Sequence, residues 1–228
     1  MANNGPHQGN GALITFEGGE GSGKSTQIQY LARRLEGCGI TVVQTREPGG
    51  CPMAESIRAL LVTGEPGAML PETELLLMLA ARAEHVRRVI LPALARGAWV
   101  ICDRYMDSSV VYQGFGRGLD RVQIQAFNRW VVAGAVPVRT FLLDIDPQAG
   151  LERTQRREDA ADSHDINTPS ETRFERDSRG FHERVRQGFL TLAQQEPGRF
   201  LRLNAGQSPE ALSQQIWEAL RELDGFPE

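Results

Sequence analysis

The 228-residue sequence has few cysteine and aromatic residues, no excess of positive charge and no long hydrophobic run. Its net charge of -4 disfavours a general nucleic-acid or anionic-membrane binder, because those surfaces attract concentrated Lys and Arg. No apolar run approaches the ~18 residues that span a bilayer, and the start of the chain has no signal-peptide pattern. We therefore expect a cytoplasmic protein with neither a nucleic-acid nor a membrane partner.

Cysteine usage and length limit the organisation of the chain. Three cysteines, Cys38, Cys51 and Cys102, are an odd number without metal-ligand spacing, and we expect buried free thiols in a reducing compartment. A composition that is 40% hydrophobic is enough for one sizeable core. We expect a disordered tail over residues 1–11 and a single domain over residues 12–228.

Short apolar runs alternate along the chain with segments of helical spacing. The apolar runs are residues 12–16, 40–45, 98–103, 138–145 and 199–203, and the helical segments include residues 26–35, 53–62, 72–94 and 122–132. This alternation predicts an α/β fold whose parallel sheet is covered by helices on both faces, with strands buried on both sides. The segments "EGGEGSGKS", "TREPGG" and "DRYMDSS" follow three of these strands, so they should meet at one sheet edge.

One segment, residues 157–172, contains a single large aliphatic residue and cannot bury itself. Arginine-rich sequence flanks it on both sides. We interpret residues 151–180 as a mobile lid in which two charged helices flank this flap. An exposed linker with solvated charges is the simpler alternative.

The stretch "FEGGEGSGKST" predicts a phosphate-binding loop, because Gly18, Gly23, Lys24 and Ser25 fit the pattern of spaced glycines followed by Lys and a hydroxyl. A helix that begins near Lys24 would direct backbone N–H groups at a polyphosphate. Lys24 would then contact the outer phosphates, and Ser25 would hold a magnesium ion. A glycine-rich structural turn is the alternative. The expected ATP-binding residues are Gly18, Gly19, Glu20, Gly21, Ser22, Gly23, Lys24, Ser25 and Thr26.

Two further strands end in carboxylates. "VICD" closes on Asp103, which we interpret as a second magnesium-associated acid beside the phosphate loop. Strands also end in Asp simply to cap a following turn, so the motif indicates a metal site only together with the phosphate loop. For Asp144 and Asp146 we prefer that second interpretation, a turn and a helix cap before Pro147.

Three motifs follow the phosphate loop in order: "TREPGG" at 45–50, "AARAEH" at 80–85 and "DRYMDSSVVYQG" at 103–114. Together with the loop they resemble the bacterial thymidylate kinase family, from about residue 13 to 157 and again from 173. The resemblance implies transfer of the γ-phosphoryl group of ATP to dTMP with Mg²⁺. It also implies a five-stranded parallel sheet of the P-loop nucleoside monophosphate kinase type, and a homodimer.

The resemblance also implies roles for individual residues. Arg104 and Arg58 would contact the dTMP phosphate, Glu47 and Pro48 would line the acceptor pocket, and Glu20 would bind the 3′-hydroxyl group. Arg82 would reach thymine O4, Ser109 and Gln113 would read other base-edge atoms, and Tyr112 would pack by the deoxyribose. Met78 stands where many members place a phenylalanine that stacks on thymine. The expected substrate-binding residues are Glu20, Glu47, Pro48, Arg58, Met78, Arg82, Arg104, Ser109, Tyr112 and Gln113.

Catalysis in this family needs positive charge at the transferred phosphoryl group. Some members carry arginine directly after the loop carboxylate, whereas this chain has Gly21, so the resemblance assigns the charge to Arg153 and Arg157 of the lid. The expected catalytic residues are Lys24, Arg104, Arg153 and Arg157. A kinase for another nucleoside monophosphate, or an ATP-binding switch without an acceptor, are the competing interpretations.

Overall fold

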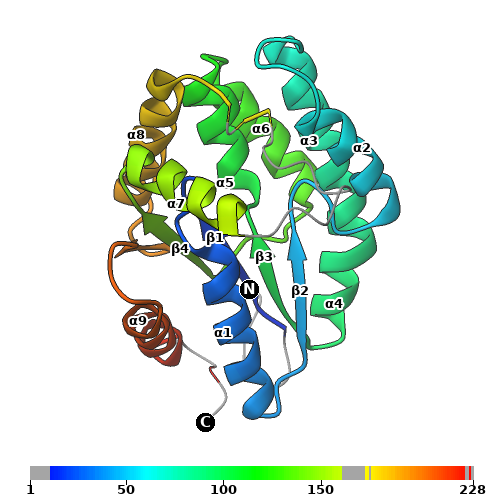
Figure 1. Cartoon of the computed structure of the whole chain (residues 1–228). Coiled ribbons are helices and arrows are strands. Elements are labelled where there is room, and N and C mark those ends of the chain that lie inside the picture. The colour runs from blue at the N-terminus through cyan, green and yellow to red at the C-terminus, as the bar shows by residue number, and fades with distance from the viewer. Residues whose placement is uncertain (1–10, 161–172, 175, 224–225, 227–228) are drawn as a thin grey trace.

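A computed structural model of the chain describes residues 11–160, 173–174, 176–223 and 226, without the side chains of 157–160 (Figure 1). Five parallel strands form one sheet in the order β2-β3-β1-β4-β5, which confirms the predicted α/β fold. The strands are β1 (Leu13–Glu17), β2 (Val42–Arg46), β3 (Trp99–Asp103), β4 (Arg139–Asp144) and β5 (Phe200–Asn204). Each begins and ends within two residues of the apolar run that predicted it.

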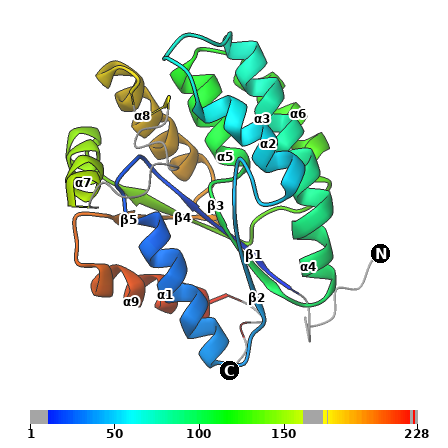
Figure 2. The same cartoon turned by 45° about the vertical axis from the view of Figure 1, so that its right-hand side comes forward.

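Helices cover both faces of the sheet, as the alternating pattern predicts. Figure 2 shows α1 and α9 together on one side and α4 on the other. The helices are α1 (Lys24–Gly37), α2 (Pro52–Val62), α3 (Pro71–His85), α4 (Leu91–Ala95), α5 (Met106–Ser109), α6 (Arg121–Val132), α7 (Pro147–Ala160), α8 (Arg179–Gln195) and α9 (Pro209–Arg221). Two π-helical segments, η1 (Val86–Ile90) and η2 (Val110–Gly116), continue α3 and α5 directly.

The core consists of layers on the two sides of the sheet. Phe16 and Phe141 of neighbouring strands pack towards α1 and α9, with ring centroids 5.2 Å apart. On the opposite face, Leu142 packs against a cluster that contains Phe181 and Phe189 of α8. Adjacent residues of β4 therefore serve opposite layers, as the two-residue period of a strand requires.

The structure corrects three expectations. β2 has no fully buried residue, because it is an edge strand with only β3 beside it. Cys38 is exposed at the end of α1, although Cys51 and Cys102 are buried and all three thiols are free. The first four residues of the flap expected at 157–172 are helical, because α7 runs to Ala160; residues 161–172 lie outside the described chain. Most of the expected tail also lies outside it.

The carboxyl ends of the strands lie between α2 and α3 on one side and α7 and α8 on the other (Figure 1). This edge receives the loops that follow β1, β2 and β3. Among the described residues, no helix is long and apolar enough to cross a membrane.

Candidate active site

The loop between β1 and α1 lies against backbone of neighbouring elements. Gly18 has a φ of +138°, and a Cβ on it would lie 2.4 Å from the Leu143 carbonyl oxygen. Gly21 has a φ of +64°, and a Cβ there would lie 2.0 Å from the carbonyl oxygen of Gly150 in α7. Only glycine fits these two positions, because both the backbone angle and the space exclude a side chain.

The start of α1 leaves its N-terminal backbone groups open to an anion. Gly23 is the N-cap and supplies no side-chain acceptor, and the first turn contains no acidic residue. Lys24 Nζ donates to the carbonyl oxygens of Gly18 at 3.2 Å and Gly19 at 2.9 Å. Burial, together with nearby Arg104, lowers the Lys24 pKa. Helix N-terminus and ammonium group thus make a positive site at this loop.

A cavity of about 310 Å³ lies at the carboxyl ends of the central strands. Every residue predicted to bind ATP or the acceptor lines it, except Gly18 and Gly19, which line a small adjoining hollow. The two predicted metal ligands, Ser25 and Asp103, line it as well. The phosphate loop and the acceptor motifs therefore face one common space.

Arg104 lies between the loop carboxylate and the ring of Tyr112. Its Nη2 donates to Glu20 at 2.6 Å, its Nη1 donates to the Gly18 carbonyl at 2.9 Å, and its guanidinium lies 5.0 Å from the Tyr112 ring centroid. Tyr112 Oη also donates to Glu20, at 3.3 Å. Burial would raise the Glu20 pKa, but Arg104 and Lys24 outweigh it, so the pKa is lowered and the carboxylate stays charged.

Glu17, at the end of β1, holds the turn that carries Arg104. Its carboxylate accepts from Tyr105 N at 2.8 Å and from Ser108 Oγ at 2.6 Å. Burial raises the pKa of Glu17 to about 7. No motif singles out this residue in the sequence, because it stands simply as the last position of an apolar strand.

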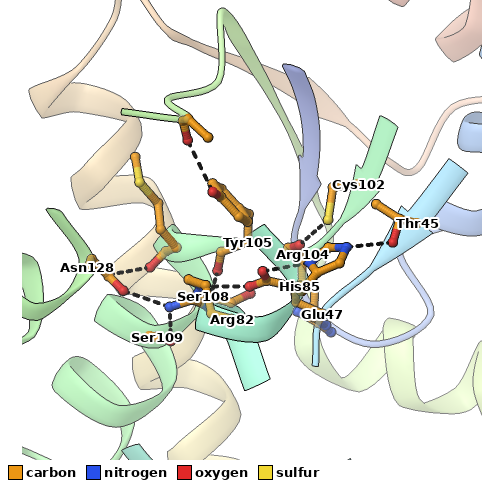
Figure 3. A network of polar contacts seen from close by, with 12 residues as sticks. Thr45, Glu47, Arg82, His85, Cys102, Arg104, Tyr105, Ser108, Ser109 and Asn128 are labelled. Atoms are coloured by element: carbon orange, nitrogen blue, oxygen red, sulfur yellow. Dashed lines mark hydrogen bonds and ion pairs between the residues drawn. The ribbon is translucent and has the colours of Figure 1, made fainter. Parts of the chain in front are cut away.

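Arg82 of α3 is 1% exposed and donates to four groups (Figure 3). Its Nε donates to Glu47 at 2.6 Å, and its Nη2 donates to the Tyr105 carbonyl at 3.0 Å. Its Nη1 donates to Ser109 at 3.0 Å and to Asn128 of α6 at 2.6 Å. The guanidinium is thereby fixed in position before any ligand contacts it.

His85 and Asn128 are members of this network that sequence reasoning missed. His85 Nδ1 lies 2.9 Å from Glu47 Oε1, and its Nε2 lies 2.7 Å from Thr45 Oγ1. His85 closes the "AARAEH" motif, so its place beside Arg82 on α3 was a usable signal. Asn128 had none, because it is a single polar residue in a helix remote in sequence. His85 ties β2 and the loop after it to α3, and Asn128 ties α3 to α6.

Arg58 and Met78 line the cavity from α2 and α3. Arg58 Nη1 donates to the Pro48 carbonyl at 2.9 Å, and burial lowers the Arg58 pKa. Met78 shares this wall with Phe174, whose ring packs edge-on against Tyr112 with centroids 5.9 Å apart. Sequence reasoning missed Phe174, which follows the acidic flap and carried no motif of its own.

Asp103 supports the expectation of a magnesium site. Its Oδ1 is buried and has no hydrogen-bond partner in the part of the chain that the structure describes. A carboxylate oxygen left unpaired at the cavity wall is unusual in a folded protein and fits a cation ligand. Ser25, the first-turn hydroxyl of α1, lines the same cavity. These two residues have the donor chemistry that Mg²⁺ prefers.

Of the two predicted lid arginines, Arg153 has a described side chain, and this side chain does not line the cavity. Arg153 Nη1 donates to the Ala205 carbonyl at 2.9 Å, and Arg153 lines a separate hollow beside β5. The side chain of Arg157 lies outside the described residues. Asp146 accepts from Gln148 N at 3.0 Å, as expected of a helix cap.

The expectation of a cap is wrong for Asp144. This carboxylate instead pairs with Arg186 of α8 at 2.8 Å and with Arg202 of β5 at 2.7 Å. The ion pairs lower the Asp144 pKa against the effect of burial. Asp144 therefore joins β4, β5 and α8.

Comparison with known proteins gives one family. The family model described as thymidylate kinase matches residues 16–216. A thymidylate kinase of Magnetococcus marinus is 48% identical over 94% of this chain and 96% of its own, and one of Geobacter sulfurreducens is 50% identical over 92% and 96%. The crystal structure of thymidylate kinase from Ehrlichia chaffeensis has a TM-score of 0.72 and 32% identity, over 92% of this chain and 99% of that one. The chain belongs to the thymidylate kinase family.

Proposed function

We propose that the protein transfers the γ-phosphoryl group of ATP to dTMP, giving dTDP and ADP. The observation that carries the proposal is the single cavity that joins the phosphate loop to the acceptor motifs. In the transfer, an oxygen of the dTMP phosphate forms the new bond to the γ-phosphorus, and the bond from that phosphorus to the oxygen of ADP breaks. The protein needs no nucleophile of its own, so its task is to position and neutralise two anions.

The donor side of the site consists of Lys24 and the N-terminus of α1. Both would hold the β- and γ-phosphates, which carry the charge that a helix N-terminus and an ammonium group bind best. Ser25 and Asp103 would hold Mg²⁺, which would neutralise charge on the phosphates. Arg153 and Arg157 of α7 would supply further positive charge from the side of the lid.

The acceptor side would consist of Arg104 and Arg58 for the phosphate, Glu20 for the 3′-hydroxyl, and Arg82 for the base. A negative charge is unexpected in a loop that would bind phosphates. The bond from Arg104 to Glu20 and a hydroxyl donor from the sugar would account for it, which supports this assignment. Ser109, Tyr112 and Gln113 complete the wall. Glu47 and Pro48 close the pocket from the loop after β2.

The test is ADP release by the purified full chain with Mg²⁺ and ATP, compared across dTMP, dUMP, dCMP, dGMP and AMP. We expect dTMP to give the highest kcat/KM, and Lys24→Ala to lose ~100-fold or more, since it removes a charge that the transition state needs. If no monophosphate stimulates ADP release by wild type, the protein is a nucleotide-binding switch and not a kinase.

We also propose that the protein is a homodimer in the cytoplasm. α6 exposes Val122 at 71%, Phe127 at 42% and Trp130 at 77%, an unusual concentration of apolar surface for a solvent-facing helix. The free thiols fit a reducing compartment. In sedimentation velocity, Trp130→Glu should shift the protein to monomer, whereas Arg33→Glu on the exposed side of α1 should not. A wild-type monomer would contradict the proposal.

A further inference from the structure

Gln113 lines the cavity, and its side-chain amide is only partly satisfied by hydrogen bonds within the described residues. Its side chain is 0% exposed, and its Nε2 donates to Glu74 Oε1 at 2.8 Å. Its Oε1 is buried and has no hydrogen-bond partner within the described residues, although Gln113 lines the cavity. One N–H of the amide is thus satisfied, and the atom left wholly without a partner is the acceptor oxygen.

Glu74 determines which way this amide turns. The Glu74 side chain is fully buried on α3, where Arg173 Nη2 donates to it at 2.7 Å and Arg117 Nη2 lies 3.4 Å away. A carboxylate between two guanidinium groups has only acceptors to offer, so the neighbouring amide must present its NH₂ group. The orientation of Gln113 thus follows from the charge of its partner and does not depend on how its oxygen and nitrogen are assigned.

Arg173 is itself held firmly, which keeps Glu74 in place. Arg173 is 1% exposed, its Nε donates to the Leu61 carbonyl at 3.1 Å, and its backbone N–H donates to the Val62 carbonyl at 3.0 Å. The ion pair of Arg173 and Glu74 therefore connects α2 and α3 to the segment before α8. A buried pair with this many bonds resists reorientation of either partner.

An acceptor oxygen facing the base can pair only with a donor. The Watson–Crick edges of thymine and uracil carry one donor, the ring N3–H, between two carbonyl oxygens. Cytosine has an unprotonated acceptor at N3 and its donor on the exocyclic N4, so an acceptor oxygen placed at N3 disfavours it. We propose that Glu74 is a positioning residue that fixes Gln113 with its carbonyl oxygen towards the acceptor base, and so selects pyrimidines with an N3–H group over cytosine. This inference rests on the proposed function, because it assumes a pyrimidine monophosphate in the cavity.

The test compares Glu74→Gln with wild type on dTMP, dUMP and dCMP. A neutral amide at position 74 can present either oxygen or NH₂, so Gln113 becomes free to turn its NH₂ group towards cytosine N3. We expect the dTMP-to-dCMP ratio of kcat/KM to fall about 10- to 100-fold, mainly through KM, because that is the effect of one buried acceptor without its donor. The dTMP-to-dUMP ratio should not change, since both bases carry N3–H.

Two variants separate this role from a purely structural one. Glu72→Gln, on the exposed side of the same helix, should leave all three ratios unchanged. Gln113→Met removes the acceptor without touching Glu74, and should also lower the dTMP-to-dCMP ratio. An unchanged ratio in folded Glu74→Gln overturns the inference; if that variant does not fold, an unchanged ratio in Gln113→Met overturns it. Wild type inactive on dTMP would instead refute the proposed function.

Discussion

The buried pair of Arg82 and Glu47 gives a quantitative prediction about stability. The two side chains are 1% and 4% exposed, and the Arg82 Nε and Glu47 Oε2 atoms lie 2.6 Å apart. Removing one partner of such a pair costs about 3 to 5 kcal/mol, since the other charge is left buried without compensation. Glu47→Gln keeps the shape and one acceptor oxygen, so we expect the lower end of this range, about 3 kcal/mol.

The assay is thermal unfolding of Glu47→Gln followed by calorimetry. For a chain of this size, 1 kcal/mol lowers Tm by roughly 2 to 4 °C, so the variant should melt roughly 6 to 12 °C below wild type. Glu84→Gln is the matched control, because its ion pair with Arg88 is exposed and such pairs contribute little to stability. A Glu47→Gln variant as stable as the control would refute the claim that this pair holds Arg82.

Three further predictions concern protonation, metal and thiols. Burial raises the pKa of Glu17 from its ordinary value of 4.5 to about 7. The favourable contribution of this group to stability is therefore full below pH ~4.5 and is lost as pH rises through ~7. Glu17→Gln should therefore gain Tm relative to wild type between pH 5 and 8, in thermal scans across that range; a constant difference would contradict this. Asp103→Asn should raise the Mg²⁺ concentration for half-maximal rate by about tenfold or more, with the KM for dTMP little changed; a Mg²⁺ titration at saturating ATP checks it. In the folded protein Cys38 should react rapidly with a thiol reagent, whereas Cys51 and Cys102 should react only on unfolding. Both of these thiols are buried, and burial raises the Cys102 pKa well above its usual value. Fast reaction at Cys102 in the folded protein would contradict this prediction.

The sheet and its functional edge could be predicted because their signals are local. Each strand is a short apolar run, and parallel strands bring their carboxyl ends to one edge whatever their order. The order β2-β3-β1-β4-β5 could not be obtained in the same way, because it depends on packing between segments far apart in sequence. The edge position of β2, and hence its partial exposure, follows from that order.

The polar network of Gln113, Glu74 and Arg173 could not be predicted from the sequence, for a different reason. Glu74 and Gln113 are separated by 39 positions, and Glu74 and Arg173 by 99. A glutamate in the first turn of a helix interacts favourably with the helix dipole, so from the sequence alone it is expected to be a solvated residue. Glu74 is buried because η2 and the segment before α8 contact it on α3, and these contacts join parts of the chain that are far apart in sequence.

Arg82 and Arg104, two of the three arginines expected to contact dTMP, show how the fold distinguishes roles that residue type alone leaves open. Four of the five N–H groups of Arg82 donate to protein atoms, which leaves one for a ligand among the described contacts. Arg104 donates with only two, to Gly18 and Glu20, so three remain. A single remaining donor suits one carbonyl oxygen of a base, whereas several on one planar group suit the oxygens of a phosphate. The number of bonds already made in the fold therefore distinguishes the two arginines, and it supports the proposal that Arg82 would contact the base and Arg104 the phosphate.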